Sequence, residues 1–356
     1  MFQLSILRNL FGISAMLLLI SAGQAQATTA YAYVSNQKTN VSVINLATMQ
    51  QVATLDVGSS GPRGIGITDD GKLLVTANQE SGNLSIVDLG SGKLLRQVPV
   101  GKNPEFVRVQ GYTAYISYEP SSTGGPPPKP GSPEHAEAAA DKSDDLPGHI
   151  AIIDLQSGKL IADITGKPET EGIEFHRDGK QLIVTNESDN SITLHDKQSG
   201  KLLQTIELRK FGVRPRGIKS SPDGKTLLTT LEFSNKMLVL DSNYRLIKEV
   251  PTADAPYGVA FDKAGQRVYV AAGKAQLLQV FDAKNFNKIK DIKTGKRCWH
   301  FTLTPDEQHL LLACGKSDEI VVVDTVKLEV SKRIPGMSLP WGIVSYPKAM
   351  GSLDQP

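Results

Sequence analysis

Cysteine is scarce in this 356-residue chain, and several common catalytic and cofactor motifs are missing. The two cysteines form no C-x-x-C-H motif, which excludes a covalent c-type haem. The six histidines have neither zinc-finger nor H-E-x-x-H spacing, and there is no G-x-S-x-G nucleophile elbow. The formal net charge is only +2 at pH 7. This balance gives no reason to expect nucleic acid or an anionic membrane as a partner.

Long hydrophobic runs are missing after residue 27. The one such run, residues 10–20, is short beside the about 20 residues of a transmembrane helix. Arg8 precedes it, and Ala25-Gln26-Ala27 follows it with small residues at the −3 and −1 positions of a cleavage site. We therefore predict a secretory signal peptide over residues 1–27 and a periplasmic product without a membrane span; the alternative is an uncleaved anchor.

What the sequence does contain is an internal repeat. Each unit opens with a short tripeptide and continues with brief β-branched stretches bounded by Gly, Asp or Ser, a pattern typical of strands joined by tight turns. The openings are Pro62-Arg63-Gly64, Pro104-Glu105-Phe106, Thr170-Glu171-Gly172, Pro215-Arg216-Gly217, Pro256-Tyr257-Gly258, Cys298-Trp299-His300 and Pro340-Trp341-Gly342. Their spacing is 41 to 45 residues except for one interval of 66, which contains an insertion. This period with four strands per unit predicts a β-propeller.

The two ends of the chain complete the number of blades. Residues 31–36 enter a unit at its second strand, whereas residues 340–345 form a first strand with nothing after it. Together they make one composite blade, which closes the ring and leaves no unpaired edge. The prediction is an all-β, seven-bladed propeller over residues 28–350, with four-stranded blades, an insertion at 120–147 in the third blade and a tail at 351–356.

The repeat resembles the YVTN family of β-propellers over nearly all of the predicted domain. Tyr33-Val34-Ser35-Asn36, Val75-Thr76-Ala77-Asn78 and Val184-Thr185-Asn186 carry the resemblance. Two further stretches, Trp299-His300-Phe301 and Leu339-Pro340-Trp341-Gly342, look most like the periplasmic propellers associated with pyrroloquinoline quinone-dependent catabolism. The resemblance implies the fold and an accessory role in that context, and no reaction.

The middle residue of each opening is expected to surround one mouth of the central channel. This ring holds Arg63, Glu105, Glu171, Arg216, Tyr257, Trp299 and Trp341, with His300 beside it. Two arginines and three aromatic residues suit a small anionic, planar or aromatic ligand. Alternatively, the Arg and Glu side chains neutralise each other and the tryptophans fill the channel as core. His300 is either an axial ligand, a base or a hydrogen-bonded structural residue.

Two further features lie near this mouth. Cys298 and Cys314 face each other across a predicted hairpin, and an oxidising compartment favours a disulfide over two buried thiols. The insertion contains Pro126-Pro127-Pro128-Lys129-Pro130 and a small, charged stretch, so it cannot bury enough apolar area to fold alone. It is either a lid or docking arm, or a tolerated loop.

Three functions are compatible with these patterns. The first is a monomeric, non-enzymatic binding or scaffold protein for a small anionic or aromatic ligand or a periplasmic redox partner, which requires no cofactor or metal. The second is a lactonase-like hydrolase in which Glu105, Glu171, Asn78 and Asn186 hold a divalent cation. The third is a cell-surface interaction module. Fold alone does not select among them.

Overall fold

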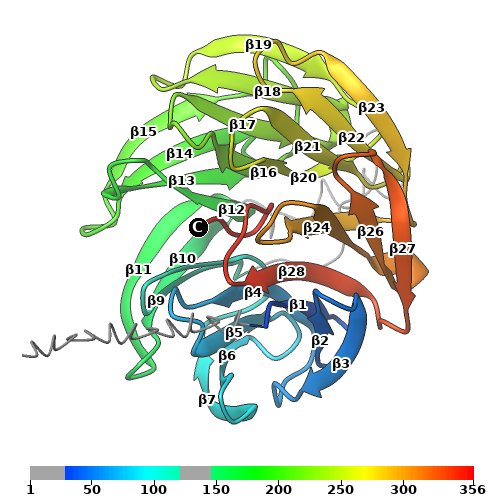
Figure 1. The fold of residues 1–356 in the computed structure, drawn as a ribbon. Coiled ribbons are helices and arrows are strands. Elements are labelled where there is room, and N and C mark those ends of the chain that lie inside the picture. Colours follow the sequence, from blue (N-terminus) through cyan, green and yellow to red (C-terminus); the bar gives the residue numbers. More distant parts are fainter. Residues whose placement is uncertain (1–28, 121–145) are drawn as a thin grey trace, which may run out of the picture.

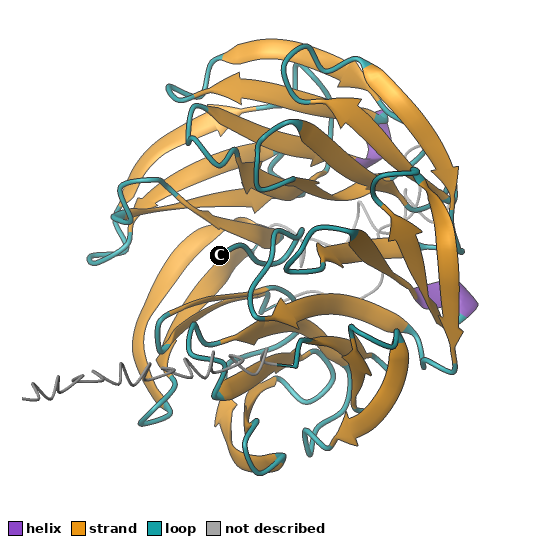
Figure 2. Cartoon of the chain, viewed as in Figure 1, coloured by secondary structure: helices purple, strands orange, loops and turns teal. Residues whose placement is uncertain are grey.

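The computed structural model describes residues 29–120 and 146–356. The predicted signal peptide and residues 121–145 of the predicted insertion lie outside the described residues. The described chain forms seven four-stranded antiparallel sheets around a central channel (Figures 1 and 2). Its helical elements are two single turns of 3-10 helix, η2 (Glu232–Ser234) and η3 (Gly315–Ser317).

Twenty-eight strands build the sheets. The first fourteen are β1 (Tyr31–Asn36), β2 (Val41–Asn45), β3 (Gln50–Leu55), β4 (Pro62–Ile67), β5 (Leu73–Asn78), β6 (Asn83–Asp88), β7 (Lys93–Pro99), β8 (Val107–Gln110), β9 (Thr113–Tyr118), β10 (Pro147–Asp154), β11 (Lys159–Pro168), β12 (Thr170–Phe175), β13 (Gln181–Asn186) and β14 (Ser191–Asp196). The others are β15 (Leu202–Glu207), β16 (Pro215–Ser220), β17 (Thr226–Leu231), β18 (Lys236–Asp241), β19 (Leu246–Pro251), β20 (Pro256–Phe261), β21 (Arg267–Ala272), β22 (Leu277–Asp282), β23 (Lys288–Lys293), β24 (Cys298–Leu303), β25 (His309–Cys314), β26 (Glu319–Asp324), β27 (Glu329–Pro335) and β28 (Pro340–Tyr346).

The composite blade closes the ring as predicted. Its strand order is β28-β1-β2-β3, and β28 pairs with β1 through Val344 opposite Tyr33 and Ile343 opposite Val34. The other six sheets each follow the chain from the innermost to the outermost strand. The seven-bladed, all-β fold class is therefore confirmed. Residues 121–145 stand in the sequence between β9 and β10, in the third blade when the composite blade is counted as the first.

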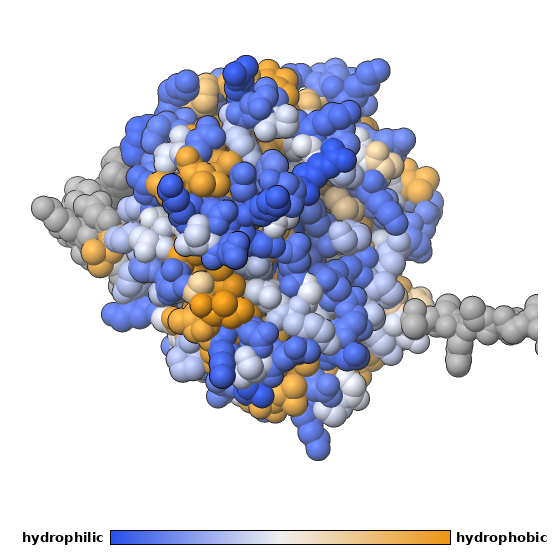
Figure 3. Space-filling model, turned by 90° about the vertical axis from the view of Figure 1, so that its left-hand side faces the viewer, coloured by the Kyte–Doolittle hydropathy of each residue, from blue (hydrophilic) through white to orange (hydrophobic). Residues whose placement is uncertain are grey.

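Burial follows the position of a strand within its blade. The second strands are packed between neighbouring blades; every residue of β5, for example, is buried. Fourth strands lie on the rim and expose apolar side chains such as Val52, Leu95, Ile161 and Leu203. In the side view, apolar patches are separated by a mainly hydrophilic surface (Figure 3). Stability therefore comes from the faces between blades rather than from the rim.

The backbone at each opening repeats even where the side chains differ. The residue just before each opening tripeptide has a positive φ, between 47° and 71°: Gly61, Asn103, Glu169, Arg214, Ala255, Arg297 and Leu339. In six of these blades its carbonyl accepts a hydrogen bond from the residue that follows the second strand, for example Glu232 N–H to Arg214 O (2.9 Å). The left-handed turn is therefore fixed by this backbone hydrogen bond, which brings the residue before the opening beside the residue after the second strand.

The end of the chain enters the channel from the opposite side. After β28, Gly351 forms an isolated β-bridge with Thr302, and the Ser352 N–H donates to the Phe301 carbonyl (3.0 Å). The C-terminus consequently lies near the centre of the ring (Figure 1). The segment predicted as a tail is packed against the inner strands, and Ser352 and Leu353 are buried.

Candidate functional site: the channel mouth

The openings gather at one end of the channel around a cavity of about 230 Å³. Six of the eight predicted ligand-binding residues line this cavity: Arg63, Glu105, Arg216, Tyr257, Trp299 and Trp341. Glu171 lies directly behind them and is only 3% exposed. His300 is 1% exposed and lies deeper in the channel. The opening tripeptides thus predict the location of the mouth, while its charge pattern depends on further residues.

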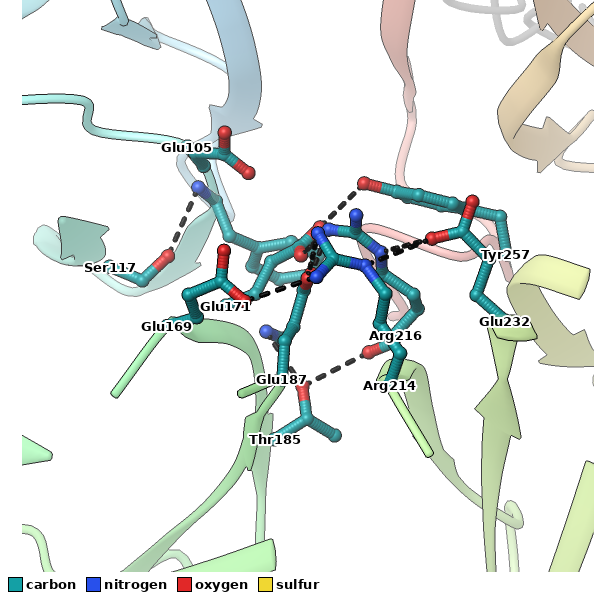
Figure 4. A network of polar contacts seen from close by, with 12 residues as sticks. Glu105, Ser117, Glu169, Glu171, Thr185, Glu187, Arg214, Arg216, Glu232 and Tyr257 are labelled. Atoms are coloured by element: carbon teal, nitrogen blue, oxygen red, sulfur yellow. Dashed lines mark hydrogen bonds and ion pairs between the residues drawn. The ribbon is translucent and has the colours of Figure 1, made fainter. Parts of the chain in front are cut away.

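One half of the mouth is a buried network of ion pairs centred on Arg216. The Arg216 guanidinium pairs with Glu171 and Glu187 through Nη1 and with Glu232 through Nε (2.8 Å). The Tyr257 hydroxyl donates to Glu171 Oε1 (2.6 Å), and the Arg216 guanidinium carbon lies 4.9 Å from the Tyr257 ring centroid (Figure 4). In this half, arginine and glutamate neutralise each other, as one of the two interpretations of the sequence expects.

A second arginine, Arg214, pairs with carboxylates of the same network. Arg214 pairs with Glu187 (2.6 Å), Glu169 (3.1 Å) and Glu232 (3.4 Å). Figure 4 shows the guanidinium groups of Arg214 and Arg216 close together, with the carboxylates around them. The two arginines therefore share their counter-charges, so that loss of one carboxylate leaves each arginine with another partner.

The sequence-based prediction missed several of these residues. Arg214 and Arg297 precede an opening, while Glu119, Glu187 and Glu232 directly follow a second strand. Both positions recur in every unit, and in six units a backbone hydrogen bond joins them; Glu119 N–H instead donates to the Lys102 carbonyl (3.1 Å). The sequence therefore contained a pattern that could have identified these residues, but this pattern lies at repeat positions outside the opening tripeptides.

Burial and pairing shift the pKa values of this half in opposite directions. Burial alone would lower the pKa of Arg216, but Tyr257 and Glu232 raise it above its ordinary value. Burial likewise would raise the pKa of Glu232, but Arg216 and Arg214 hold it below the usual range. Burial raises the pKa of the Tyr257 hydroxyl. At neutral pH Arg216 and Glu232 are therefore charged and Tyr257 is a neutral donor.

The other half of the mouth is aromatic and carries cations without lining carboxylates. Its lining residues come from the β24–β27 sheet and the composite blade: Gln37, Arg297, Trp299, Lys316, Leu339 and Trp341. The Arg297 guanidinium carbon lies 5.7 Å from the Trp299 ring centroid, and Arg297 also reaches Glu232 (3.6 Å). Lys316 is exposed and forms no ion pair within the described residues. This half therefore offers positive charge beside indole rings.

Arg63 joins the two halves. Its Nη1 pairs with Glu105, its Nε donates to Gln37 Oε1 (3.0 Å), and its guanidinium carbon lies 5.8 Å from the Trp341 ring centroid. The side chains of Arg63 and Glu105 are 15% and 12% exposed. Glu105 is thus occupied by an arginine and is not open to a cation.

His300 lies below the aromatic half as a buried neutral imidazole. Its ring contacts Trp341 (4.3 Å between centroids), Tyr257 (5.3 Å) and Phe106 (6.1 Å). Nδ1 lies 3.1 Å from Ser352 Oγ, and Nε2 has no hydrogen-bond partner among the described residues. Burial, together with Arg216, Lys219 and Arg63, lowers the pKa of His300 well below its ordinary value. The residue forms the floor of the aromatic half.

The residues considered for a divalent cation are not brought together. Asn78 donates to Asn83 Oδ1 (2.8 Å) and Ser85 Oγ (2.9 Å), while Asn186 bonds Ser191 and Thr193 in its own blade. Glu171 is held by Arg216 and Tyr257. Over residues 29–120 and 146–356, no group of three or more His, Cys, Asp or Glu side chains could hold a metal ion.

Cys298 and Cys314 form a disulfide. They are register partners across the β24–β25 hairpin. Cys298 immediately precedes Trp299 in the chain, and Cys314 immediately precedes Gly315. A Cβ on Gly315 would overlap the Trp299 ring. The disulfide and this glycine therefore hold Trp299 in its place at the mouth.

Comparison with known proteins shows a propeller that is YNCE-like in its N-terminal part. A model of the YNCE-like beta-propeller family matches residues 20–113. A curated relative, the uncharacterized protein YncE of Salmonella typhimurium, is 30% identical over 149 residues, which are 41% of this chain and 42% of the relative. The match therefore spans less than half of the relative's length.

Solved structures share the architecture at low identity. A functionally unknown protein from Desulfotomaculum acetoxidans DSM 771 superposes with a TM-score of 0.73 at 16% identity, covering 88% of this chain and 98% of that protein. A Bacteroides uniformis protein, provisionally described as a 6-phosphogluconolactonase, gives 0.70 at 18% identity, covering 89% and 99%. These similarities show the fold alone. No helix among the described residues has the length and apolar character needed to cross a bilayer.

Proposed function

For a seven-bladed propeller that is YNCE-like over residues 20–113, we propose a periplasmic binding protein, accessory to quinoprotein-dependent oxidation. Its ligand is a small planar anion held in the aromatic half of the mouth. One observation carries this proposal: the lining charges are segregated, with carboxylates confined to the arginine-rich half and its border. The half that contains Trp299 and Lys316 has cations and indoles in its lining and no carboxylate.

This arrangement can recognise such a ligand in two ways. The Trp299 ring supplies a flat apolar surface, and the Arg297 guanidinium beside it suits a carboxylate geometrically. Lys316 supplies a second positive charge at the rim. Pyrroloquinoline quinone, a flat molecule with several carboxylates, has this chemistry. The context comes from the resemblance carried by Trp299-His300-Phe301 and Leu339-Pro340-Trp341-Gly342, which build this same half of the mouth.

A lactonase-like hydrolase is the second candidate, supported by the fold it shares with the Bacteroides uniformis protein. It requires a divalent cation near Glu171. The Glu171 carboxylate accepts from Tyr257 and pairs with Arg216, so a cation there would have to displace an arginine. The geometry therefore favours binding over metal-assisted hydrolysis.

Tryptophan fluorescence tests the proposal directly, because the chain has two tryptophans and both line the mouth. We expect pyrroloquinoline quinone to quench the emission saturably, with free tryptophan as the control for absorbed light. Arg297→Gln with Lys316→Gln should weaken binding about tenfold or more, equivalent to the loss of about 1.4 kcal/mol. Lys225→Gln, an exposed lysine on a turn at the opposite face, is the matched control.

Two outcomes would overturn the proposal. One is the absence of saturable quenching at about 1 mM ligand, weaker than any specific site of this kind. The other is quenching that the Arg297→Gln and Lys316→Gln changes leave unaltered. Stoichiometric divalent metal in the purified protein, together with turnover that Glu171→Ala abolishes, would instead support the hydrolase.

A further inference from the structure

The opposite end of the channel holds a second, larger cavity of about 470 Å³. It lies where the inner strands end in their turns, and the C-terminal segment forms one of its walls. Its lining includes Val109, Phe175, Pro222 and Met350 as apolar residues. A cavity of this size with a few polar groups is typical of small-molecule sites. None of the residues of the mouth takes part in it.

Cations outnumber carboxylates in the lining of this cavity. Four cationic side chains, Arg108, Arg177, Lys263 and Lys348, stand against two acidic ones, Asp69 and Asp354, and the terminal carboxylate of Pro356. Lys348 is already paired with Asp69 (2.7 Å) and Asp354 (3.5 Å). Arg177 and Lys263 form no ion pair within the described residues, and both are exposed at the entrance. Positive charge therefore remains uncompensated at the cavity.

Behind the lining, the buried charges are also unbalanced. Arg108 and Lys219, whose side chains are 2% and 1% exposed, share one buried carboxylate, Glu174, at 3.0 and 3.2 Å. Buried charge without a counter-charge is unfavourable, and an anion in the cavity would reduce this cost. The excess of cations is thus continuous from the channel interior to the entrance.

Arg108 also has unused hydrogen-bonding capacity. Its Nη2 donates to Glu174 and its Nη1 to the Leu353 carbonyl (2.8 Å). Its Nε is buried and has no hydrogen-bond partner among the described residues. A buried donor without an acceptor is costly, so a ligand oxygen at this position would be stabilising.

From this cavity, its cations and the unpartnered donor, we infer that the turn end of the propeller binds a small organic anion. The anionic group lies against Arg108 and between Arg177 and Lys263, and the apolar part contacts Val109 and Met350. The anion is either a phosphate ester or a carboxylate. This site is separate from the mouth and does not depend on the function proposed for it.

Isothermal titration calorimetry with phenyl phosphate and benzoate tests the inference, with phenol as the neutral control. We expect saturable binding of at least one anion and none of phenol; the tighter anion identifies the group that the site prefers. Arg177→Gln with Lys263→Gln should weaken binding at least about tenfold. Arg297→Gln with Lys316→Gln at the mouth should change it less than about twofold. Tryptophan emission should stay constant, because both tryptophans lie at the mouth.

Three results would overturn the inference. The first is no saturable heat for either anion at about 10 mM, because a site that stays empty at this concentration is not specific. The second is an affinity that Arg177→Gln with Lys263→Gln leaves unchanged, and the third is an affinity that is lost only in the mouth variants. If the double variant does not fold, Lys263→Gln alone serves, because this side chain is exposed. It should weaken binding several-fold, and an unchanged affinity would equally refute the inference.

Discussion

The two ends of the channel are built by the same inner strands but balance their buried charges in opposite ways. At the mouth, Arg214 and Arg216 share four carboxylates: Glu169, Glu171, Glu187 and Glu232. Three residues further along β12 and β16, Glu174 stands opposite Lys219, and Arg108 shares this one carboxylate. In the arginine-rich half of the mouth the arginines therefore have more than enough carboxylates to balance their charge, whereas the turn end has an excess of cations.

This difference shows that the backbone of a propeller can stay the same while the side chains in its channel differ. Backbone geometry repeats from blade to blade, so each position on an inner strand lies at a set depth in the channel. The side chain at that depth is then free to vary. In this protein the mouth and the turn end differ in charge because residues three positions apart on the same strands carry different side chains, while the fold is the same.

The largest effect is expected from removing Glu174, the buried carboxylate that Arg108 and Lys219 share at the turn end. Glu174→Gln leaves Arg108 and Lys219 buried without a full counter-charge, and it should lower the free energy of unfolding by about 3–5 kcal/mol. Urea denaturation at pH 7 measures this loss. Adding Lys219→Met to Glu174→Gln should recover part of it. A loss below about 1 kcal/mol would show that the cluster is not a coupled buried unit.

Lys219 should make stability depend on pH in a direction opposite to that of an ordinary ion pair. Burial, with a contribution from Arg108, lowers the pKa of Lys219 from 10.5 to about 8. Between pH 8 and 10 the unfolded chain therefore binds more protons at this residue than the folded protein, so stability rises with pH. The unfolding free energy of the native protein, relative to Lys219→Met, should increase by about 2 kcal/mol over this interval. A flat or falling difference would contradict the assignment.

A smaller effect is expected when the aromatic half of the mouth is disturbed. In Gly315→Ala the new methyl group overlaps the Trp299 ring, which has to move. Overpacking of this kind should cost about 1–2 kcal/mol and shift the tryptophan emission. It should also weaken ligand binding at the mouth and leave the anion at the turn end unaffected. Unchanged emission would show that Trp299 is not held against Gly315.

The smallest effect on stability is expected in the arginine-rich half of the mouth. Glu169→Gln removes one partner of Arg214, but Glu187 and Glu232 remain within 2.6 and 3.4 Å. The free energy of unfolding should fall by less than about 1 kcal/mol, several times less than for Glu174→Gln. Parallel denaturation curves of the two variants give this ratio. Equal losses would remove the contrast between the two ends.

Much of the architecture was predictable because the repeat is a local signal. The spacing of the openings predicted the blades, and the incomplete units at the two ends predicted the pairing of β28 with β1. The same alignment brought Arg63, Glu105, Arg216, Tyr257, Trp299 and Trp341 to one cavity. A residue's repeat position determines its depth in the channel, and this relation needs no knowledge of the neighbouring blade.

The partners of those residues could not be predicted in the same way. Glu232 reaches Arg216 within the same blade, 16 residues away, and Glu187 reaches it from the preceding blade, 29 residues away. Both follow a second strand, but the repeat does not indicate which arginine each of them meets. Glu174 likewise lies three residues beyond Glu171 on β12 but pairs with Arg108 and Lys219 from two other blades.

The sequence by itself therefore determined the number of blades, the closure of the ring and the residues that surround the mouth. Only the tertiary structure decided which charges are compensated, where the C-terminal segment lies, and that a second cavity exists at the turn end. The physical reason is that strands and turns follow from local propensity and period. Ion pairing in the channel instead depends on which side chains of separate blades meet in a buried space.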